Sequence, residues 1–361
     1  MKLLLLGDVS PTSHNRHVWE AKDLSTLFED TADLLRQSDA TVVNLECALT
    51  ESQNKIAKFG PCLAAPAQTA EVLASMGVTL VGLSNNHVFD FGVEGITDTL
   101  RTLAAAGIPY TGFGKDHEDA RRNYVIEKDG VRVAIIAVCE KEFSYALEDR
   151  MGSRPYDEYD TPEDVRAAKA TCDRVVVMYH GGKEHCRYPS PRLRKLCRAL
   201  VKSGADVVLC QHSHCIGAYE EFMGGHILYG QGNFHFVAPE DGDGWESSLA
   251  LMYDTDANTV EFTPLEMTEY GIHRVKGAQA EEMMSAFTQR SQSLATGEWK
   301  EGWHAFCEEN RKKYEKVIAE AALPTSEERS NARFAHYLDC EAHTDVWREL
   351  FPTYNQTNEK S

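Results

Sequence analysis

Strand-like apolar runs alternate with helical patterns in the first part of the chain. Continuous apolar segments of strand length predict buried strands over residues 3–6, 40–44, 78–83, 175–179 and 207–209. Apolar residues spaced three and four apart predict helices over residues 24–37, 66–76, 93–106 and 191–202. Thr161, which is followed by proline and two acidic residues, predicts the start of a further helix.

Several later strand signals come in pairs that are joined by short turns. Lys128-Asp129-Gly130 links strands predicted at 124–127 and 131–138. Further pairs are predicted at 219–222 with 226–229, and at 249–253 with 260–264. Alternating strands and helices followed by hairpins favour an α/β fold in which two sheets pack face to face, with helices outside.

The pattern changes after about residue 270, where strand signals end and helical spacing dominates. We therefore expect one domain over residues 1–268 and a helical extension over 269–361 that packs on it and ends in a polar tail from Asn355. The aromatic and histidine side chains of this extension suit either a substrate lid or ordinary packing of apolar helix faces, and packing is favoured. They are Trp303, His304, Phe306, Phe334, His336, Tyr337 and His343.

Composition narrows the classes of function. The chain has 361 residues, of which 42% are hydrophobic, so it can bury a large core. Its net charge of −19 argues against nucleic-acid binding, which requires a basic face. An anionic substrate would need a metal ion or a local group of basic side chains.

The amino terminus and the cysteines favour a cytoplasmic protein. The apolar run at residues 3–6 is too short for a signal peptide, and no small-residue cleavage site follows it. No segment approaches the roughly 18 apolar residues of a membrane span. The ten cysteines are scattered and include no CxxC pair, which favours reduced, buried thiols.

Polar side chains follow five of the predicted strands, at the points where those strands end. Because ligand sites of open α/β sheets lie at the carboxyl ends of the strands, we expect these side chains to form one shared site. The chain must turn after its strand if the histidines at 212 and 214 are to converge, because an extended chain would carry them apart. The residues are Asp8; Asn44 and Glu46; Asn86, His87 and Asp90; His180 and Glu184; and His212 and His214.

These residue types suit a divalent metal ion. Carboxylates, an amide oxygen and neutral imidazoles favour Mn, Fe or Zn, with Ca and Mg as further options. Six donors exceed the four that a tetrahedral zinc ion uses, so one or two ions are expected, with a carboxylate shared between them if there are two. Cys186, Cys210 and Cys215 lie nearby in the sequence, but we expect them to be small buried residues rather than ligands.

Several motifs resemble those of a known family. The order Gly-Asp, acid, Asn-His-x-x-Asp, His and His-x-His resembles the calcineurin-like metallophosphoesterase superfamily. More specifically, the chain resembles the CapA family, which is named for poly-γ-glutamate capsule synthesis, over about residues 2–264. The segments that carry this resemblance are Gly7-Asp8-Val9, Asn44-Leu45-Glu46, residues 84–92 (SNNHVFDFG), His180 to Glu184, residues 204–214 and residues 229–234 (YGQGNF).

The resemblance implies a four-layer α/β/β/α sandwich and a role for each candidate residue. Asp8 and His214 would bind a first ion, Glu46 would bridge, and Asn86, His180 and His212 would bind a second ion. His87 would be the histidine that protonates a leaving group, oriented by Asp90. Substrate contacts are expected from Asn44, Glu184 and Asn233.

Two departures from the superfamily pattern affect the first ion. Ser10 stands where the superfamily usually has a histidine, and Glu46 stands where it has an aspartate. The first ion site is therefore short of a strong ligand, and we expect it to be weak, filled by a different metal, or empty.

Three functions are compatible with these residues. The favoured one is a metal-dependent hydrolase that cleaves phosphoester or γ-glutamyl and other peptide bonds with a metal-activated water. The second is chemistry at a substrate carboxylate, by transfer or α-proton exchange, in poly-γ-glutamate or peptide metabolism. The third is a non-catalytic binding module. A small molecule or a peptide-like polymer is the expected partner, with no nucleic acid and no membrane span.

Overall fold

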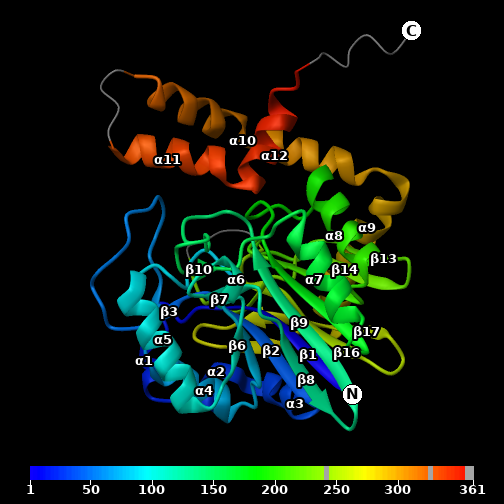
Figure 1. Cartoon of the computed structure of the whole chain (residues 1–361). Helices are drawn as coiled ribbons and strands as arrows, with labels where there is room; N and C mark the ends of the chain where they lie inside the picture. Colours follow the sequence, from blue (N-terminus) through cyan, green and yellow to red (C-terminus); the bar gives the residue numbers. More distant parts are fainter. Residues whose placement is uncertain (240–243, 324–327, 354–361) are drawn as a thin grey trace.

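Two large mixed sheets lie face to face in the computed structural model, which describes residues 1–239, 244–323 and 328–353 (Figure 1). In the first sheet, β1 pairs in parallel with β2 and in antiparallel fashion with β16. A short strand, β15 (Asn233–His235), also pairs with β1 in parallel. The order is β18 (Ile272–Arg274), β17 (Thr259–Met267), β16 (Ser247–Asp254), β1 (Lys2–Val9), β2 (Ala40–Leu45), β5 (Leu80–Gly82) and β6 (Tyr110–Thr111).

The second sheet has a parallel centre and an antiparallel hairpin at each edge. Its order is β13 (Tyr219–Phe222), β14 (Gly225–Leu228), β12 (Val207–Gln211), β11 (Arg174–His180), β9 (Val131–Cys139) and β8 (Tyr124–Lys128). The three hairpins that the turn signals predict are confirmed as β8 with β9, β13 with β14, and β16 with β17. Two small pairs lie outside these sheets: β3 (Ala48–Leu49) with β4 (Ala64–Ala65), and β7 (Phe113–Gly114) with β10 (Gly152–Ser153).

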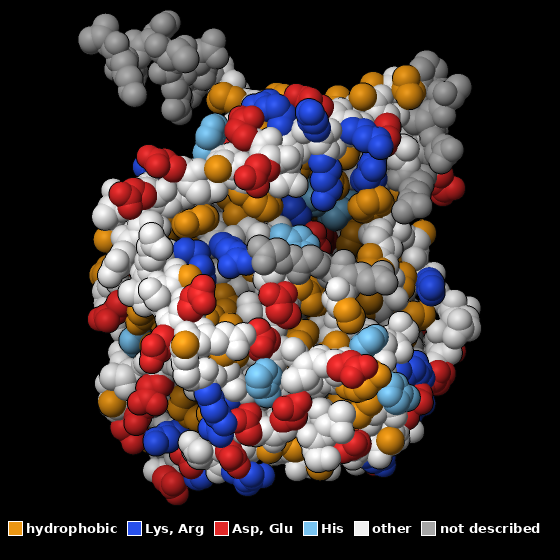
Figure 2. Space-filling view, turned by 180° about the vertical axis from the view of Figure 1, so that it is seen from behind, with side chains coloured by type: hydrophobic (Ala, Val, Ile, Leu, Met, Phe, Trp, Pro, Cys, Tyr) orange, Lys and Arg blue, Asp and Glu red, His pale blue; other side chains and the backbone are white. Residues whose placement is uncertain are grey.

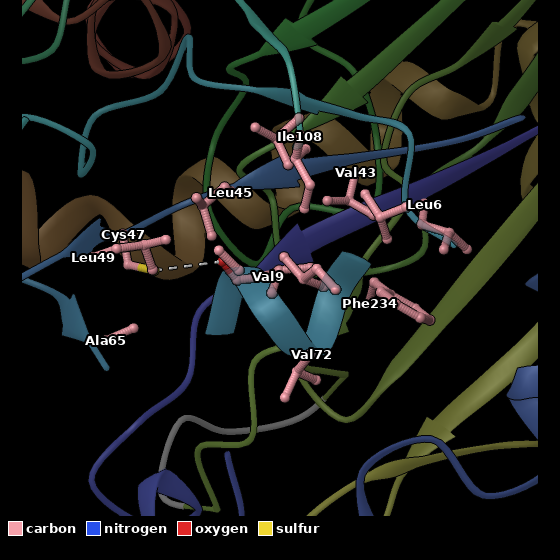
Figure 3. Packing of buried hydrophobic residues seen from close by; sticks show 14 of the residues in the cluster. Leu6, Val9, Val43, Leu45, Cys47, Leu49, Ala65, Val72, Ile108 and Phe234 are labelled. Atoms are coloured by element: carbon pink, nitrogen blue, oxygen red, sulfur yellow. Dashed lines mark hydrogen bonds between the residues drawn. The ribbon is translucent and has the colours of Figure 1, made fainter. Parts of the chain in front are cut away.

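Alternate residues of the strands serve different layers, as the period of two requires. In β1, Leu3 and Leu5 belong to the cluster between the two sheets, which also contains Val133 and Val176 of the second sheet. Leu4 and Leu6 belong to the cluster under the helices of the first sheet. Figure 3 shows part of that outer cluster, in which Leu6, Val43 and Leu45 gather with Val72 of α4.

Helices cover both outer faces, so the four-layer α/β/β/α arrangement is confirmed. Residues of five helices join the cluster on the first sheet: α1 (Arg16–Glu20), α2 (Leu24–Phe28), α3 (Ala32–Arg36), α4 (Gln68–Ser75) and α5 (Gly92–Ala106). Residues of α7 (Asp160–Lys169) and α8 (Pro191–Ser203) join the cluster on the second sheet, to which Leu294 and Trp299 of the carboxy-terminal helices also belong. The short α6 (His117–Ala120) lies beside β7 and β10.

Two predicted helices differ in detail from the structure. The helix predicted over 24–37 is broken into α2, a 3₁₀ turn (Glu29–Thr31) and α3, because Glu29 has a φ of 40° that an α-helix does not allow. Thr161 lies inside α7 rather than at its start. The N-cap is Tyr159, and Oδ1 of Asp157, two residues before it, accepts the backbone N–H groups of Tyr159 and Asp160 at 2.8 and 2.9 Å.

The carboxy-terminal helices are α9 (Gly277–Thr296), α10 (Trp299–Ala321), α11 (Glu328–Asp339) and α12 (Glu341–Leu350). The last three lie across the end of the sandwich, whereas α9 lies against β13 and β17 (Figure 1). Phe287 of α9 packs on Phe262 of β17, with ring centroids 5.1 Å apart. The other three helices share a cluster that contains Trp303 and Tyr337 and also takes in Cys186 of the sandwich.

The first sheet continues further along the chain than the sequence predicts, because β18 at residues 272–274 follows the point near residue 270 where strand signals end. The domain boundary at residues 268 and 269 stays a prediction, and the polar tail predicted from Asn355 lies outside the described residues. Among those described, no helix is both long enough and apolar enough to cross a membrane. The ten cysteines all lie within the described residues and form no disulfide, and all except Cys62 are buried, as expected for reduced thiols.

The apolar cluster between the two sheets contributes to the stability of the sandwich, and a substitution at Leu5 measures this contribution. Replacing Leu5, which is 1% exposed, by alanine removes buried methyl groups and leaves a cavity, so we expect a loss of about 2–5 kcal/mol in the free energy of unfolding. Denaturant unfolding measures this loss. The matched control Leu338→Ala, at a side chain that is 53% exposed, should change stability by less than about 0.5 kcal/mol. Equal losses in the two variants would contradict the assignment of this core.

Candidate metal centre

The side chains predicted as metal ligands come together at one edge of the sandwich. Parallel pairing brings the carboxyl ends of β1 and β2 together in one sheet and those of β11 and β12 together in the other, and the two groups meet where His180 lies 3.2 Å from Glu46. All six side chains are at least nine-tenths buried. They are Asp8 in β1, Glu46 after β2, Asn86 after β5, His180 at the end of β11, and His212 and His214 after β12.

Glu46 lies at the centre of this group. Its Oε1 is 3.2 Å from Nε2 of His180 and 3.9 Å from Nε2 of His214. One donor atom each of Asp8, Glu46 and His180 lie within 4.8 Å of one another, and the same holds for Glu46, His212 and His214. Glu46 belongs to both sets, but these sets differ from the implied division, in which His214 joins Asp8 and His212 joins His180, so the assignment of ligands to each ion and the bridging role of Glu46 stay predictions.

The buried, unsatisfied polar atoms of the centre and the raised pKa values of its carboxyl groups are those expected of a cation site without its ion. Both carboxyl oxygens of Glu46 and Nδ1 of His212 are buried without a hydrogen-bond partner. Burial raises the pKa of Glu46 to about 8, and burial together with Glu46 raises the pKa of Asp8 to about 7. An uncompensated carboxylate in such a place is costly. A divalent ion would satisfy these atoms, and carboxylate with imidazole is a donor set that suits Mn, Fe and Zn.

A strained turn brings the two neighbouring histidines to the same place. His212 and His214 both adopt left-handed backbone conformations, with φ of 76° and 53°. Such conformations are uncommon for residues other than glycine and cost of order 1–3 kcal/mol each. The ring centroids of the two histidines are 5.8 Å apart as a result. The turn that the sequence requires after this strand is confirmed.

Asparagines orient several of these donors. Nδ2 of Asn44 donates to Oδ1 of Asp8 at 2.7 Å and lies 3.1 Å from Nδ1 of His180. Oδ1 of Asn233 lies 2.8 Å from Nδ1 of His214, which leaves Nε2 of that ring toward Glu46. Partners of this kind fix the tautomer and the aim of ligating imidazoles. Contact of Asn44 and Asn233 with substrate stays a prediction, and the structure gives both a positioning contact that the sequence does not reveal.

His87 is held by a carboxylate and an ammonium group. Its Nδ1 is 2.7 Å from Oδ2 of Asp90, which also accepts the backbone N–H of Leu63 at 2.8 Å. Lys58 forms a buried ion pair with Asp90 and lies 3.2 Å from Nδ1 of His87. Burial and Lys58 lower the pKa of His87, so its imidazole is neutral at neutral pH with Nε2 available for proton exchange. Lys58 comes from a loop without a regular pattern, and no sequence signal singles it out.

A further acidic residue, Glu142, reaches the centre from the loop after β9. Its Oε2 is 3.4 Å from Nε2 of His212. The strand before Glu142 is predicted from the sequence, but Glu142 is not among the predicted ligands because it does not directly follow that strand. Glu184, a predicted substrate contact, pairs with Lys183 at 3.1 Å, and this ion pair lowers its pKa well below the usual value. Besides burial, the charges of both acids help to raise the pKa of Glu46.

Comparison with known proteins identifies the family. The model of the family described as "Bacterial capsule synthesis protein PGA_cap" matches residues 2–238. The chain belongs to this family. The matched PGA_cap region contains all six candidate ligands together with His87, Asp90, Glu142 and Glu184. It ends before β16, so helices α9 to α12 lie outside it.

Named PGA_cap relatives cover most of the chain. The "PGA biosynthesis protein CapA" of Bacillus subtilis (strain 168) is 30% identical over 275 residues, which are 73% of this chain and 71% of the relative. The "Capsule biosynthesis protein CapA" of Bacillus anthracis is 27% identical over 74% of this chain and 68% of its own length. A "Probable polyglutamine synthesis accessory protein" of Mycobacterium tuberculosis (strain CDC 1551 / Oshkosh) is 28% identical over 72% and 71%.

Similarity to solved structures is weaker. A hypothetical protein from Thermus thermophilus aligns with a TM-score of 0.45 and 14% identity, over 76% of this chain and 100% of its own. A 5′-nucleotidase from Candida albicans SC5314 aligns with a TM-score of 0.44 and 9% identity, over 86% and 58%. Similarity at this level does not bear on activity.

Metal binding should depend on the charge of Glu46. We expect Glu46→Gln, which keeps the shape and removes the charge, to weaken binding of Mn²⁺ or Zn²⁺ by more than about 100-fold, and Asn233→Ala, which only orients His214, by about 10–100-fold. Equilibrium dialysis with elemental analysis measures both. Glu261→Gln, on the strand β17, is the control and should bind as the unaltered protein does. Unchanged binding in Glu46→Gln would exclude Glu46 as a ligand.

Metal binding should also strengthen with pH. The pKa values of Asp8 and Glu46, about 7 and 8, lie above the ordinary 3.8 and 4.5. The metal-free fold therefore loses stability as pH rises from these ordinary values through about 7 and 8. An ion that requires ionised ligands reverses this loss. We expect the rise in Tm on adding Mn²⁺ to grow between about pH 6 and pH 8. A gain that is flat across this interval would contradict the assigned protonation states.

Proposed function

We propose that the protein is a metal-dependent hydrolase that cleaves γ-glutamyl amide bonds of a carboxylate-rich peptide polymer. One observation supports this most directly, namely that the buried carboxylate of Glu46 has no hydrogen-bond partner and lies beside two imidazoles of the opposite sheet. Membership of the PGA_cap family and the names of the relatives support the choice of polymer.

The residues of the centre divide the work of hydrolysis. When bound, one or two divalent ions would supply an activated water at neutral pH and polarise the scissile carbonyl. Asp8, Glu46, Asn86, His180, His212 and His214 would hold them, and Nε2 of His180 already lies 3.0 Å from Oδ1 of Asn86. Hydrogen bonds from Asn44 to Asp8 and between Asn233 and His214 would hold these two ligands in orientation. The first ion site lacks a donor because Ser10 stands where the superfamily usually has a histidine. Hydrolysis would therefore require at least one tightly bound ion, which is the second ion of this centre.

His87 is the proton carrier in this proposal. Neutral at neutral pH, it accepts a proton at Nε2 as water attacks the carbonyl carbon, and returns this proton to the leaving nitrogen as the C–N bond breaks. Asp90 at 2.7 Å keeps Nδ1 occupied and stabilises the ring while it is protonated. The ion pair with Lys58 balances the negative charge of Asp90 while the ring of His87 is neutral.

Basic side chains beside the centre suit an anionic substrate. Lys183 lies in the loop after β11, and the pKa of Lys313 on α10 is lowered by burial and by the charges of Lys183 and Arg333. Figure 2 shows Lys and Arg side chains gathered on the carboxy-terminal helices above a hollow that exposes histidine and acidic side chains. In a chain of net charge −19, such a local group of cations gives the carboxylates of a polymer a place to bind.

Activity should require both the metal centre and the proton carrier. With added Mn²⁺ or Zn²⁺, the protein should release new amino ends from poly-γ-glutamate. Asn86→Ala should lose activity together with the metal of the central site. His87→Gln should keep its metal content and lower kcat by about 10²–10⁴-fold. The assay follows free amines, and elemental analysis accompanies each variant.

Other outcomes of the same experiment separate the alternatives. Release of phosphate or alcohol from phosphoesters, with poly-γ-glutamate untouched, would replace the amide by a phosphoester. Deuterium uptake from heavy water at the α-carbon without cleavage would assign chemistry at a substrate carboxylate. Binding of the polymer without either reaction, unchanged in His87→Gln, would make the protein a binding module.

A further inference from the structure

A second group of metal-binding side chains lies at the junction of α11 and α12, outside the region that the family model matches. His336 stands in the last turn of α11, Cys340 separates the two helices, and His343 stands in the first turn of α12. One donor atom of each lies within 4.8 Å of the others. Helical spacing of four and three residues, together with the break at Cys340, turns all three side chains to the same side.

Each imidazole of this group has one ring nitrogen in contact with a polar side chain, and His336 has its other nitrogen unsatisfied. Nδ1 of His343 lies 2.7 Å from the hydroxyl of Tyr314, and Nε2 of His336 lies 2.5 Å from Oε1 of Glu142. Nδ1 of His336 is buried without a hydrogen-bond partner, and the side chain as a whole is only 10% exposed. Metal-bound histidines show this arrangement, in which the second ring nitrogen meets a carboxylate or another polar group.

The thiol of Cys340 completes the set. It is 1% exposed, and its Sγ lies 3.8 Å from Oε2 of Glu140. The nearest charged side chains already form ion pairs with each other, Lys183 with Glu184 at 3.1 Å and Glu140 with Arg192 at 2.6 Å. Because Lys183 is neutralised in this way, its charge repels a bound cation less. A divalent ion with one thiolate and the carboxylate of Glu142 nearby would form a neutral group. Burial, with Lys183 next, lowers the pKa of His343 well below its usual value, so its imidazole is neutral as a ligand must be.

We propose that His336, Cys340 and His343 bind a zinc ion at a second site, separate from the central site. Thiolate with imidazole is a donor set that favours zinc, whereas the central site offers carboxylates, an amide and imidazoles without sulfur. Water would occupy the fourth position. This assignment does not depend on the hydrolytic activity proposed above.

The zinc would tie the extension to the central site. Glu142 lies 2.5 Å from His336 on one side and 3.4 Å from His212 on the other. An ion that fixes the ring of His336 would therefore fix the carboxylate that faces His212. The site acts in this way as an anchor for α11 and α12 over the edge where the strands end.

Cobalt substitution tests the site directly, since only a sulfur ligand gives an intense thiolate-to-cobalt charge-transfer band. Loaded with Co²⁺, the unaltered full-length protein should show this band, and Cys340→Ala should lack it and bind one ion fewer. Cys307→Ala removes another buried cysteine of the same helical cluster and should keep the band. Asn86→Ala, which disrupts only the central site, should also keep it.

A second variant guards against unfolding as the cause. His343→Gln preserves the thiol and should lower the intensity of the band or weaken zinc binding by at least about tenfold, while circular dichroism shows unchanged helix content. Absence of the band in the unaltered protein, or its persistence in Cys340→Ala, would overturn the proposal. Loss of all bound metal in Glu46→Gln would do so as well, since the second site would then hold no ion of its own.

Discussion

The central constraint in this molecule is a buried carboxylate that no protein group satisfies. Glu46 follows a strand buried on both faces, neither of its carboxyl oxygens has a hydrogen-bond partner, and its Oε1 lies beside the imidazoles of His180 and His214 of the opposite sheet. Burial holds its pKa near 8, so the metal-free fold keeps a proton there. The two sheets must face each other closely for this to occur, and the core of Leu3, Leu5, Val133 and Val176 between them fixes that spacing.

The sequence predicts the ligands of this centre well because strand ends are easy to locate. Apolar runs mark the strands, and parallel pairing sends their carboxyl ends to one edge, so Asp8, His180 and His212 can be grouped without coordinates. The two-sheet arrangement follows from the same runs with the hairpin signals. What pairing alone cannot give is the aim of each side chain, and the contacts of Asn44 and Asn233 with Asp8 and His214 emerge only from the structure.

The positions of residues in irregular segments could not be predicted from the sequence, for physical reasons. Lys58 reaches His87 and Asp90 from a loop with neither apolar periodicity nor a motif, so nothing in its neighbours indicates burial. Glu142 does not directly follow its predicted strand, and it lies in a turn where the next residue, Phe143, has a φ of 58°. The break at Glu29 depends on how a helical pattern is accommodated by the packing around it, which local propensity does not determine.

The left-handed backbone of His212 and His214 sets stability against metal binding at these two positions. Glycine or asparagine would relieve the backbone there but would remove the imidazoles. The residues that would make the metal-free fold most stable are therefore different from the residues that would bind the ion. In this chain, the ion would have to offset the strain of both positions before it adds any net stability to the fold.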